Sequence, residues 1–367
     1  MKRVLCLISN MNAGGAETFL MKIYRKLDKS KYQMDFAVNY LDKMFYEDEI
    51  QTLGGRIFRV PNKSKTMRGF RQELTKVVKE NNYKYALRIA SNAISFMDLQ
   101  IAKKAGAKVC SLRSSNSSDG NGFKAWLAHK VGFALYNRYV DVKFAPSDLA
   151  AEYTFGKKAV KNGEVSILHN GVDLDVFRFD VNARKEIRQE FGLSDEQLLV
   201  GHIGRFMAQK NHTFLLDIFK KISEKNENAV LMLVGKGELE NEIKEKIKTL
   251  GLQDKVIFTG VRADISKLLS AMDVFVFPSL YEGMPNTIIE AQATGLPCVI
   301  ADTITKEADI TGWVKYLPLS ATTDAWANLA LESVTKERKD TKQDFIDHKY
   351  DVESVVEEFV SLVFQEK

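Results

Sequence analysis

Cysteine, proline and long hydrophobic runs are all scarce in this chain of 367 residues. No apolar stretch approaches the roughly 18 residues that a membrane-spanning helix needs, so we expect no such helix. The first residues, MKRVLCLISNMNAGG, contain too short an apolar segment for a secretory signal and are better explained as a first strand. Three widely separated cysteines fit neither a disulfide framework nor a metal site, which indicates a reducing cytoplasm.

Charge is distributed unevenly along the chain. Residues 59–143 hold 17 Lys or Arg and only 5 Asp or Glu, a local net charge of +12, although the whole chain carries +5. A basic first half of this kind favours binding to a polyanion or to an anionic membrane surface. The alternative is that these charges simply solvate the outer faces of surface helices.

Short β-branched runs alternate with helical patterns along the whole chain. Near-continuous apolar strands separated by amphipathic helices are typical of parallel sheets covered on both faces. We therefore predict an α/β protein of two doubly wound, Rossmann-like domains. The expected strands are 3–9, 34–39, 56–60, 85–90, 107–112 and 140–145, followed by 198–203, 229–234, 256–259, 273–277, 297–301 and 314–317. The expected helices lie near 16–27, 67–80, 92–105, 123–138, 211–225, 238–250, 264–271, 285–295, 323–335 and 351–364.

The boundary between the two domains is expected near the segment HNGVDLD, where Asn170-Gly171 is a turn signal. This gives a first domain over residues 1–170 and a second over 171–350, while the last helix, within 351–367, is free to pack back on the first. In an open α/β sheet, ligands bind at the carboxyl ends of the strands. Motifs that fall at such ends are therefore the candidates for ligand contacts.

A glycine pair follows the first predicted strand. Gly14 and Gly15 precede the first helix, so backbone N–H groups there could face an anion or a polar substrate. The dinucleotide fingerprint G-x-G-x-x-G is absent, and a tight turn is the alternative explanation for the pair.

Two cations follow the first strand of the second predicted domain. Arg205 and Lys210 lie in one strand-to-helix loop, where a planar guanidinium and a point charge would suit a diphosphate. They could instead be ordinary exposed loop cations. Later loops of the same sheet edge carry Gly235, Gly237 and Gly260, which would let a ligand approach the backbone closely.

The most informative segment is PSLYEGMPNTIIEAQATGLP, residues 278–297. Its helix is expected to start near Pro285, with Glu282 in the preceding loop and Glu290 among apolar residues of the helix. The N–H groups of residues 283–287 would then form a helix N-terminus suited to an anion. If both glutamates were helical they would lie about 12 Å apart along the axis, too far for a glycosidase acid/base pair. This spacing favours two contacts on one long ligand.

In their order and spacing, these segments resemble the family-4 retaining nucleotide-sugar glycosyltransferases of the GT-B fold. The signature of that family is Glu-x7-Glu, present here as Glu282 and Glu290. The matching segments cover nearly the whole chain and are GGAE at 14–17, FAPSD at 144–148, HNGVD at 169–173, GRF at 204–206, QKN at 209–211, LVGKGE at 233–238 and FTG at 258–260. The start GGAETFLMKIY and the stretch Glu307–Asp309 resemble the bacterial capsule and exopolysaccharide branch of the family.

The resemblance implies a GT-B fold in which two doubly wound domains face each other across a cleft, an acceptor-side domain first and a nucleotide-sugar-binding domain second. It implies that Arg205 and Lys210 hold the donor diphosphate, that Glu282 orients the transferred sugar, and that Glu290 binds the ribose. The other implied donor contacts are Gly14, Gly15, Gly235, Gly260, Val261, Arg262, Gly283, Met284, Pro285, Asn286 and Thr287. No metal or other cofactor is implied, and a UDP-sugar is favoured as donor substrate, with a GDP-sugar as the alternative.

One segment departs from the family pattern. Many relatives carry a histidine near the reacting sugar, in the loop after the strand that reads KVCSL here, but this chain has Arg-Ser-Ser-Asn at 113–116. Retaining transfer in this family is usually explained by departure of the nucleotide and attack from the same face, without a dedicated protein base. Activity is therefore not excluded, and Arg113 and Asn116 are the candidates for contacting the acceptor.

The resemblance thus predicts a cytoplasmic, retaining hexosyltransferase that extends a lipid-linked capsular or exopolysaccharide glycan. Helix 123–138 is expected to dock the enzyme at the anionic inner face of the plasma membrane, with packing in the domain core as the alternative. The residues concerned are Trp126, Leu127, Val131 and Phe133 with Lys124, Lys130 and Arg138. Two other functions stay open, a nucleotide-sugar epimerase or other GT-B enzyme such as a phosphorylase, and a non-catalytic polyanion-binding protein. No nucleic-acid-binding module is recognisable in the sequence, so we expect no nucleic acid partner.

Overall fold

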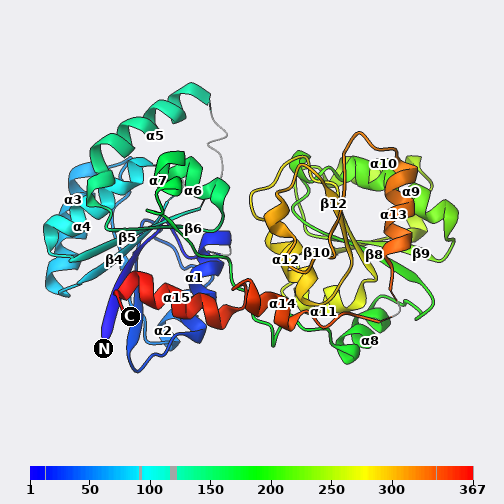
Figure 1. Ribbon diagram of the computed structural model, residues 1–367, viewed down its shortest axis with the longest axis horizontal. Helices are drawn as coiled ribbons and strands as arrows, with labels where there is room; N and C mark the ends of the chain where they lie inside the picture. Colours follow the sequence, from blue (N-terminus) through cyan, green and yellow to red (C-terminus); the bar gives the residue numbers. More distant parts are fainter. Residues whose placement is uncertain (13, 91–92, 116–121, 336, 367) are drawn as a thin grey trace. The chain divides into compact units, whose positions relative to one another are not determined.

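The computed structural model describes residues 1–12, 14–90, 93–115, 122–335 and 337–366, with side chains of the helix that starts at Gly122 described from His129 onward. The chain divides into two compact units (Figure 1). The first unit joins Met1–Gly171 to Lys349–Lys367, and the second is Val172–His348. The division after Gly171 lies one residue beyond the boundary expected from the sequence.

The first unit is built on a seven-stranded parallel sheet. Its strands lie in the order β3-β2-β1-β4-β5-β6-β7, so the chain reverses direction across the sheet between β1 and β4. This reversal is the mark of a doubly wound sheet, a class of sheet that binds its ligands at the carboxyl ends of the strands beside the reversal. The strands are β1 (Lys2–Leu7), β2 (Tyr32–Val38), β3 (Ile57–Arg59), β4 (Tyr85–Ala90), β5 (Val109–Ser114), β6 (Val142–Ala145) and β7 (Ser166–Ile167).

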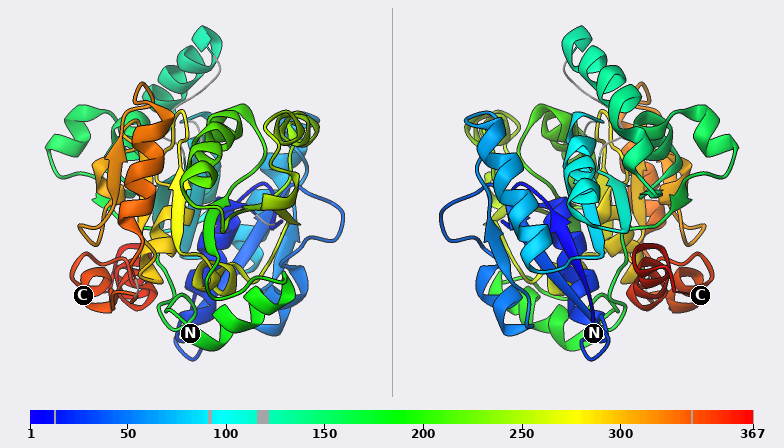
Figure 2. Two further views of the ribbon diagram at one scale, coloured as in Figure 1. Left: turned by 90° about the vertical axis from the view of Figure 1, so that its right-hand side faces the viewer. Right: turned by 90° about the vertical axis from the view of Figure 1, so that its left-hand side faces the viewer.

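Helices cover both faces of this first sheet (Figures 1 and 2). One face packs against α3 and α4, and the other against α1 and the final helix α15. The α-helices of the unit are α1 (Gly15–Lys26), α2 (Glu47–Thr52), α3 (Met67–Glu80), α4 (Met97–Ala105), α5 (Gly122–Tyr136), α6 (Asp148–Phe155), α7 (Lys157–Lys161) and α15 (Val352–Phe364), with the 3₁₀ turns η1 (Ala93–Phe96) and η2 (Asn137–Tyr139).

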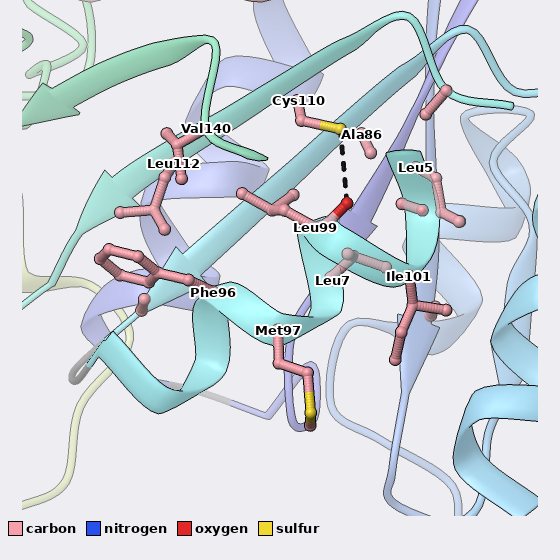
Figure 3. Close-up of a cluster of buried hydrophobic side chains, with 14 of the residues drawn as sticks. Leu5, Leu7, Ala86, Phe96, Met97, Leu99, Ile101, Cys110, Leu112 and Val140 are labelled. Carbon is pink, nitrogen blue, oxygen red and sulfur yellow. Dashed lines mark hydrogen bonds between the residues drawn. The ribbon is translucent and has the colours of Figure 1, made fainter. Parts of the chain in front are cut away.

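Alternating side chains of β1 divide the first unit's core into two clusters. Leu5 and Leu7 lie in the cluster beneath α3 and α4, whereas Val4 and Cys6 lie in the cluster beneath α1 and α15. Figure 3 shows the first of these clusters, in which the thiol of Cys110 contacts the carbonyl oxygen of Leu99 at 3.7 Å. All three cysteines are buried and free, so they act as core residues.

The second unit repeats the scheme with a six-stranded parallel sheet in the order β10-β9-β8-β11-β12-β13. Its strands are β8 (Leu198–Ile203), β9 (Ala229–Val234), β10 (Val256–Gly260), β11 (Val274–Phe277), β12 (Cys298–Ala301) and β13 (Lys315–Leu317). Its α-helices are α8 (Val181–Glu190), α9 (His212–Lys225), α10 (Glu240–Thr249), α11 (Ile265–Ala271), α12 (Asn286–Ala293), α13 (Thr323–Ser333) and α14 (Lys342–Asp347). Its 3₁₀ turns are η3 (Ala208–Lys210), η4 (Gln253–Lys255) and η5 (Lys306–Ala308). Here β8 and β11 flank the reversal of strand order, so their carboxyl ends mark the expected ligand edge.

Several short elements were not expected from the sequence, namely β7, α2, α6, α7, α8 and α14. Most are too short to establish a helical or alternating period. α8 is longer, but only Ala183, Ile187 and Arg188 are buried in it, so its apolar pattern is weak. The helix expected over 92–105 is instead the turn η1 followed by α4. Among the described residues, no helix combines the length and the apolar character that crossing a membrane requires.

Candidate functional site

The loops after β8 and β11 are joined by hydrogen bonds at the carboxyl edge of the second sheet. The amide of Leu280 donates to the carbonyl of Gln209 at 2.8 Å, and the side-chain amide of Gln209 donates to the carbonyl of Tyr281 at 2.8 Å. Asn211 has a left-handed backbone with φ 55°, and its side-chain amide donates to the carbonyl oxygen of Pro278 at 3.1 Å. The structure therefore brings together the two segments to which the sequence analysis gave most weight.

Lys210 and Glu282 form an ion pair within these joined loops. The Nζ atom of Lys210 lies 2.7 Å from Oε1 of Glu282, and their side chains are only 16% and 9% exposed. The aliphatic stem of Lys210 packs on Gly204, and its Nζ lies 4.7 Å from the ring centroid of Phe277. An ammonium and a carboxylate, both largely buried, thus lie side by side at the carboxyl edge of the sheet.

Arg205 has a different environment from Lys210. Its side chain is 71% exposed, and its guanidinium lies 3.5 Å from the carboxylate of Glu238, which is itself 55% exposed. An exposed ion pair at this distance is worth little, so the guanidinium can turn toward an anion at small cost.

At two glycines of the loop after β9, the backbone of the loop after β8 lies too close to leave room for a side chain. Gly235 has φ 136°, and a Cβ atom there would lie 2.2 Å from the carbonyl oxygen of Gly204. A Cβ atom on Gly237 would lie 2.2 Å from the carbonyl oxygen of Phe206. Gly260, at φ 70°, accepts a hydrogen bond from the amide of Gly235 at 2.9 Å. Only glycine fits at positions 235 and 237, because the Cβ atom of any other residue would push this loop away from the loop after β8.

Helix α12 starts directly after the Glu282 loop (Figure 1). Its cap position, Pro285, provides no side-chain hydrogen bond, while Gly283, Met284, Asn286 and Thr287 are all partly exposed. Ile288, Ile289 and Ala291 are buried, whereas Glu290 between them is half-buried. The first turn of α12 therefore presents backbone amides and the positive end of a helix dipole beside Glu282.

Arg262, expected near the nucleotide base, is already held by two carboxylates. Its guanidinium donates to Glu190 at 2.6 and 3.0 Å and to Asp264 at 2.8 and 2.7 Å. The hydrogen bonds that Arg262 donates to Asp264 and Glu190 raise its pKa. The adjacent Val261 is 75% exposed. The side chain of Val261 and the backbone of both residues can therefore meet a ligand without breaking those ion pairs.

In the first unit, Gly14 and Gly15 lie at the N-terminus of α1, as expected from the sequence. The carboxylate of Glu17 folds back over Gly14, so a Cβ atom there would lie 2.4 Å from Glu17 Oε2. Partial burial raises the pKa of Glu17. The protein's own carboxylate therefore lies at the helix start that the sequence analysis assigned to an external anion.

Arg113, one of the two acceptor candidates, is buried at the carboxyl end of β5, with 2% of it exposed. Its Nη2 donates to Oδ1 of Asn170 at 2.6 Å, and its guanidinium lies 3.7 Å from the ring centroid of Phe19. Burial lowers its pKa to about 9. With so little surface open to an acceptor, direct contact by Arg113 stays a prediction, and Asn116 lies outside the described residues.

Sequence reasoning did not single out Gln209, Asn211, Glu238 or Glu17. Gln209 and Asn211 flank Lys210 in the segment QKN, and Glu238 ends LVGKGE, so proximity to a motif was the signal available. Within the part of the chain that the structure describes, no group of three or more His, Cys, Asp or Glu could hold a metal ion.

Comparison with known proteins follows the division into two units. Residues 13–176 match the family "Glycosyltransferase Family 4", and residues 183–315 match "Glycosyl transferases group 1". A putative glycosyltransferase, EpsF of Bacillus subtilis (strain 168), is 36% identical over 351 residues, covering 94% of this chain and 90% of that protein. An Escherichia coli UDP-Gal:alpha-D-GlcNAc-diphosphoundecaprenol alpha-1,3-galactosyltransferase is 39% identical over 142 residues, 38% of this chain and 37% of its own length.

Solved structures resemble this chain over its full length at low sequence identity. HepE of Anabaena, in complex with UDP-glucose, covers all of both chains with a TM-score of 0.78 and 19% identity. The same protein in complex with UDP and glucose gives a TM-score of 0.77 at 17% identity. Likeness at this level of identity establishes the fold.

Proposed function

The chain belongs to the family-4 glycosyltransferases and has the GT-B fold, and from this we propose that it transfers a sugar, with retention, from a UDP-sugar to a lipid-linked glycan. The observation that carries the proposal is the pairing of Lys210 with Glu282 at the carboxyl edge of the second sheet. Both residues belong to segments that resemble the donor-binding motifs of the family. A capsular or exopolysaccharide product is the finer part of the proposal.

Donor binding would exchange the partner of Lys210. A nucleotide diphosphate brings two negative charges, and Arg205 and Lys210 are the cations available at this edge. When Lys210 turns to the diphosphate, the carboxylate of Glu282 becomes free to accept hydrogen bonds from sugar hydroxyls. The ion pair thus keeps two donor-binding groups satisfied before the donor binds, at lower cost than two unpaired, largely buried charges.

The rest of the donor would lie along α12 and the neighbouring glycine loops. Glu290 would accept hydrogen bonds from the ribose hydroxyls, and the amides of residues 283–287 would face the sugar and the phosphates. Gly235 and Gly260 would let the nucleotide base approach the backbone beside Val261. Arg262 would contribute through its backbone, since its guanidinium is held by Glu190 and Asp264.

The proposed reaction would begin with departure of the nucleotide diphosphate from the sugar. Charge that develops on the leaving diphosphate would be stabilised by the positive end of α12 and by Arg205 and Lys210, once both cations have turned to the bound diphosphate. The acceptor hydroxyl would then attack from the face that the nucleotide leaves and pass its proton to the departing diphosphate oxygen, which preserves the anomeric configuration. In the first unit, Gly14 and Gly15 are proposed donor contacts, and Arg113 and Asn116 are the proposed acceptor-side positions.

A lipid-linked acceptor would bring the enzyme to the inner face of the plasma membrane. Supporting this, α5 extends beyond the other helices of the first unit (Figures 1 and 2), and Lys130, Val131, Leu135 and Arg138 are exposed on it or just after it. Gly132 packs instead against the backbone of η1, so α5 has an inner face as well. The side chains of Lys124, Trp126 and Leu127 lie outside the described residues, while Phe133 is partly buried against the core.

A donor screen followed by product analysis tests the proposal. UDP- and GDP-sugars are ranked by thermal shift, and the best is incubated with diphospholipid-linked sugars, including GlcNAc-diphosphoundecaprenol. We expect a UDP-sugar to stabilise the protein and a product one hexose heavier, whose anomeric proton coupling matches that of the donor. A product of inverted configuration, or the Lys210→Ala variant turning over at the wild-type rate, would contradict the proposal.

A further inference from the structure

Two buried histidines lie behind Lys210 in the second unit. His202 is in β8 and fully buried, and His212 is the first residue of α9 and 2% exposed. Their rings meet edge to face with centroids 4.7 Å apart. Neither histidine has a part in the donor contacts proposed above, although polar rings are rarely buried without a reason.

The two rings continue an aromatic stack that ends beneath the ammonium of Lys210. His202 stacks on Phe277 with centroids 5.3 Å apart and an interplanar angle of 26°. The Nζ atom of Lys210 in turn lies over the ring of Phe277, 4.7 Å from the ring centroid. At the other end, Phe206 meets the ring of His212 edge to face at 4.8 Å. The stack therefore runs from the start of α9, through β8 and β11, to the proposed diphosphate-binding cation.

The hydrogen bonds of His202 determine its tautomer. Its Nδ1 atom lies 2.9 Å from the carbonyl oxygen of Val276, and a carbonyl oxygen can only accept. Nδ1 therefore carries the proton, and Nε2 of the neutral ring keeps its lone pair. Nε2 of His202 and both ring nitrogens of His212 have no hydrogen-bond partner among the described residues.

The surroundings keep both rings uncharged. Burial, the neighbouring His212 and the charge of Lys210 lower the pKa of His202 far below its usual range. Burial and the charge of Lys210 lower the pKa of His212 to about 4. The charge that acts on both histidines is thus that of Lys210, whose own ion-pair partner is Glu282.

We propose that His202 and His212 are positioning residues, a neutral imidazole pair that supports Phe277 and so holds the ammonium of Lys210 in place for the donor diphosphate. A neutral ring adds polarisable surface under Phe277 without adding charge, whereas a protonated one would set a second cation behind Lys210. The inference rests on the role proposed above for Lys210, but it can be tested without any donor.

Competitive acylation of lysines, read by mass spectrometry on the full chain, measures how firmly Lys210 is held. His212→Ala removes one ring of the stack and should raise the labelling rate of Lys210 about two- to fivefold, the range expected for a weakened cation–π contact. His212→Phe restores a ring and should return the rate to that of the wild type. Lys225, at the far end of α9, is the internal control and should not change in either variant.

Each outcome of this experiment supports or overturns the inference. Equal labelling of Lys210 in the wild type and both variants would overturn it. A parallel rise at Lys225 would also overturn it, because it would show that His212 only maintains α9. Imidazole ¹⁵N shifts of the five histidines give a second readout. We expect His202 to be neutral with its proton on Nδ1 at pH 6, and a proton on Nε2 would overturn the inference. Failure of sugar transfer would contradict the proposed function and leave these results intact.

Discussion

The ammonium of Lys210 and the carboxylate of Glu282, 72 positions apart in the sequence, lie 2.7 Å apart at the carboxyl edge of the second sheet. The pair unites the two segments that the family resemblance assigns to the donor. Because the two charges already neutralise each other, donor binding has to replace the ionic partner of Lys210 with another.

Removing the cations of this edge should slow transfer. We expect Lys210→Ala or Arg205→Ala to lower kcat/KM by about 30- to 1000-fold, roughly 2–4 kcal/mol, because each removes a charge placed for the leaving diphosphate. The assay is release of UDP in the presence of acceptor. Lys248→Ala, an exposed lysine of α10, is the matched control and should behave as the wild type. Wild-type turnover in both site variants would reject the assignment.

The two glutamates of the Glu-x7-Glu signature should fail differently. Glu290→Gln should weaken the binding of free UDP, since its proposed partner is the ribose. Glu282→Gln should leave UDP affinity unchanged or slightly higher, because it releases Lys210 from its ion pair, yet it should lower the rate with donor sugar. Calorimetry with free UDP separates the two cases. Glu245→Gln, on the exposed face of α10, is the control, and equal loss in both site variants would refute this division of roles.

Near-continuous apolar runs made the strands of the second sheet predictable from the sequence. β8 and β9 have the expected bounds, 198–203 and 229–234, because strands buried on both faces leave an uninterrupted pattern. The meeting of Arg205, Lys210 and Glu282 at one edge also followed from the rule that ligands bind at carboxyl ends of parallel strands. The order of the elements made this placement predictable, and the donor-binding roles of the three residues stay predictions.

The sequence alone could not predict which residues individual side chains would contact. Glu190 holds Arg262 from 72 positions away, and Asn170 holds Arg113 from 57 positions away. Such contacts depend on loop conformation and on packing between elements, which periodicity does not encode. The same holds for the buried histidines, because the apolar strand that contains His202 gives no sign that the ring of His212 lies beside it.

Acid should destabilise the second unit partly through His212. Its pKa is about 4 when folded and about 6.5 when unfolded, so the unfolded chain binds more protons between these values. This contribution to stability is complete above about pH 6.5 and is lost as the pH falls toward 4. Over that interval it amounts to about 3 kcal/mol.

The matched variant for this prediction is His212→Phe. It keeps a ring but cannot be protonated, so its unfolding free energy should fall less than that of the wild type between pH 7 and pH 4.5. Urea unfolding followed by circular dichroism at both pH values measures the difference. Carboxylate contributions are common to both proteins and cancel, so an identical loss in the two would rule out His212 as the titrating group.

Membrane docking, finally, should depend on both charge and the outer face of α5. Each Lys or Arg near an anionic surface adds about 1 kcal/mol of attraction, screened over roughly 10 Å at 0.1 M salt. We expect co-sedimentation with phosphatidylglycerol vesicles that weakens as salt rises and is absent with phosphatidylcholine. Val131→Glu and Leu135→Glu should reduce it, whereas Val176→Glu, an equally exposed valine of the second unit, should not. Binding indifferent to lipid charge and to salt would exclude the electrostatic mechanism, and equal effects of all three variants would exclude α5 as the contact.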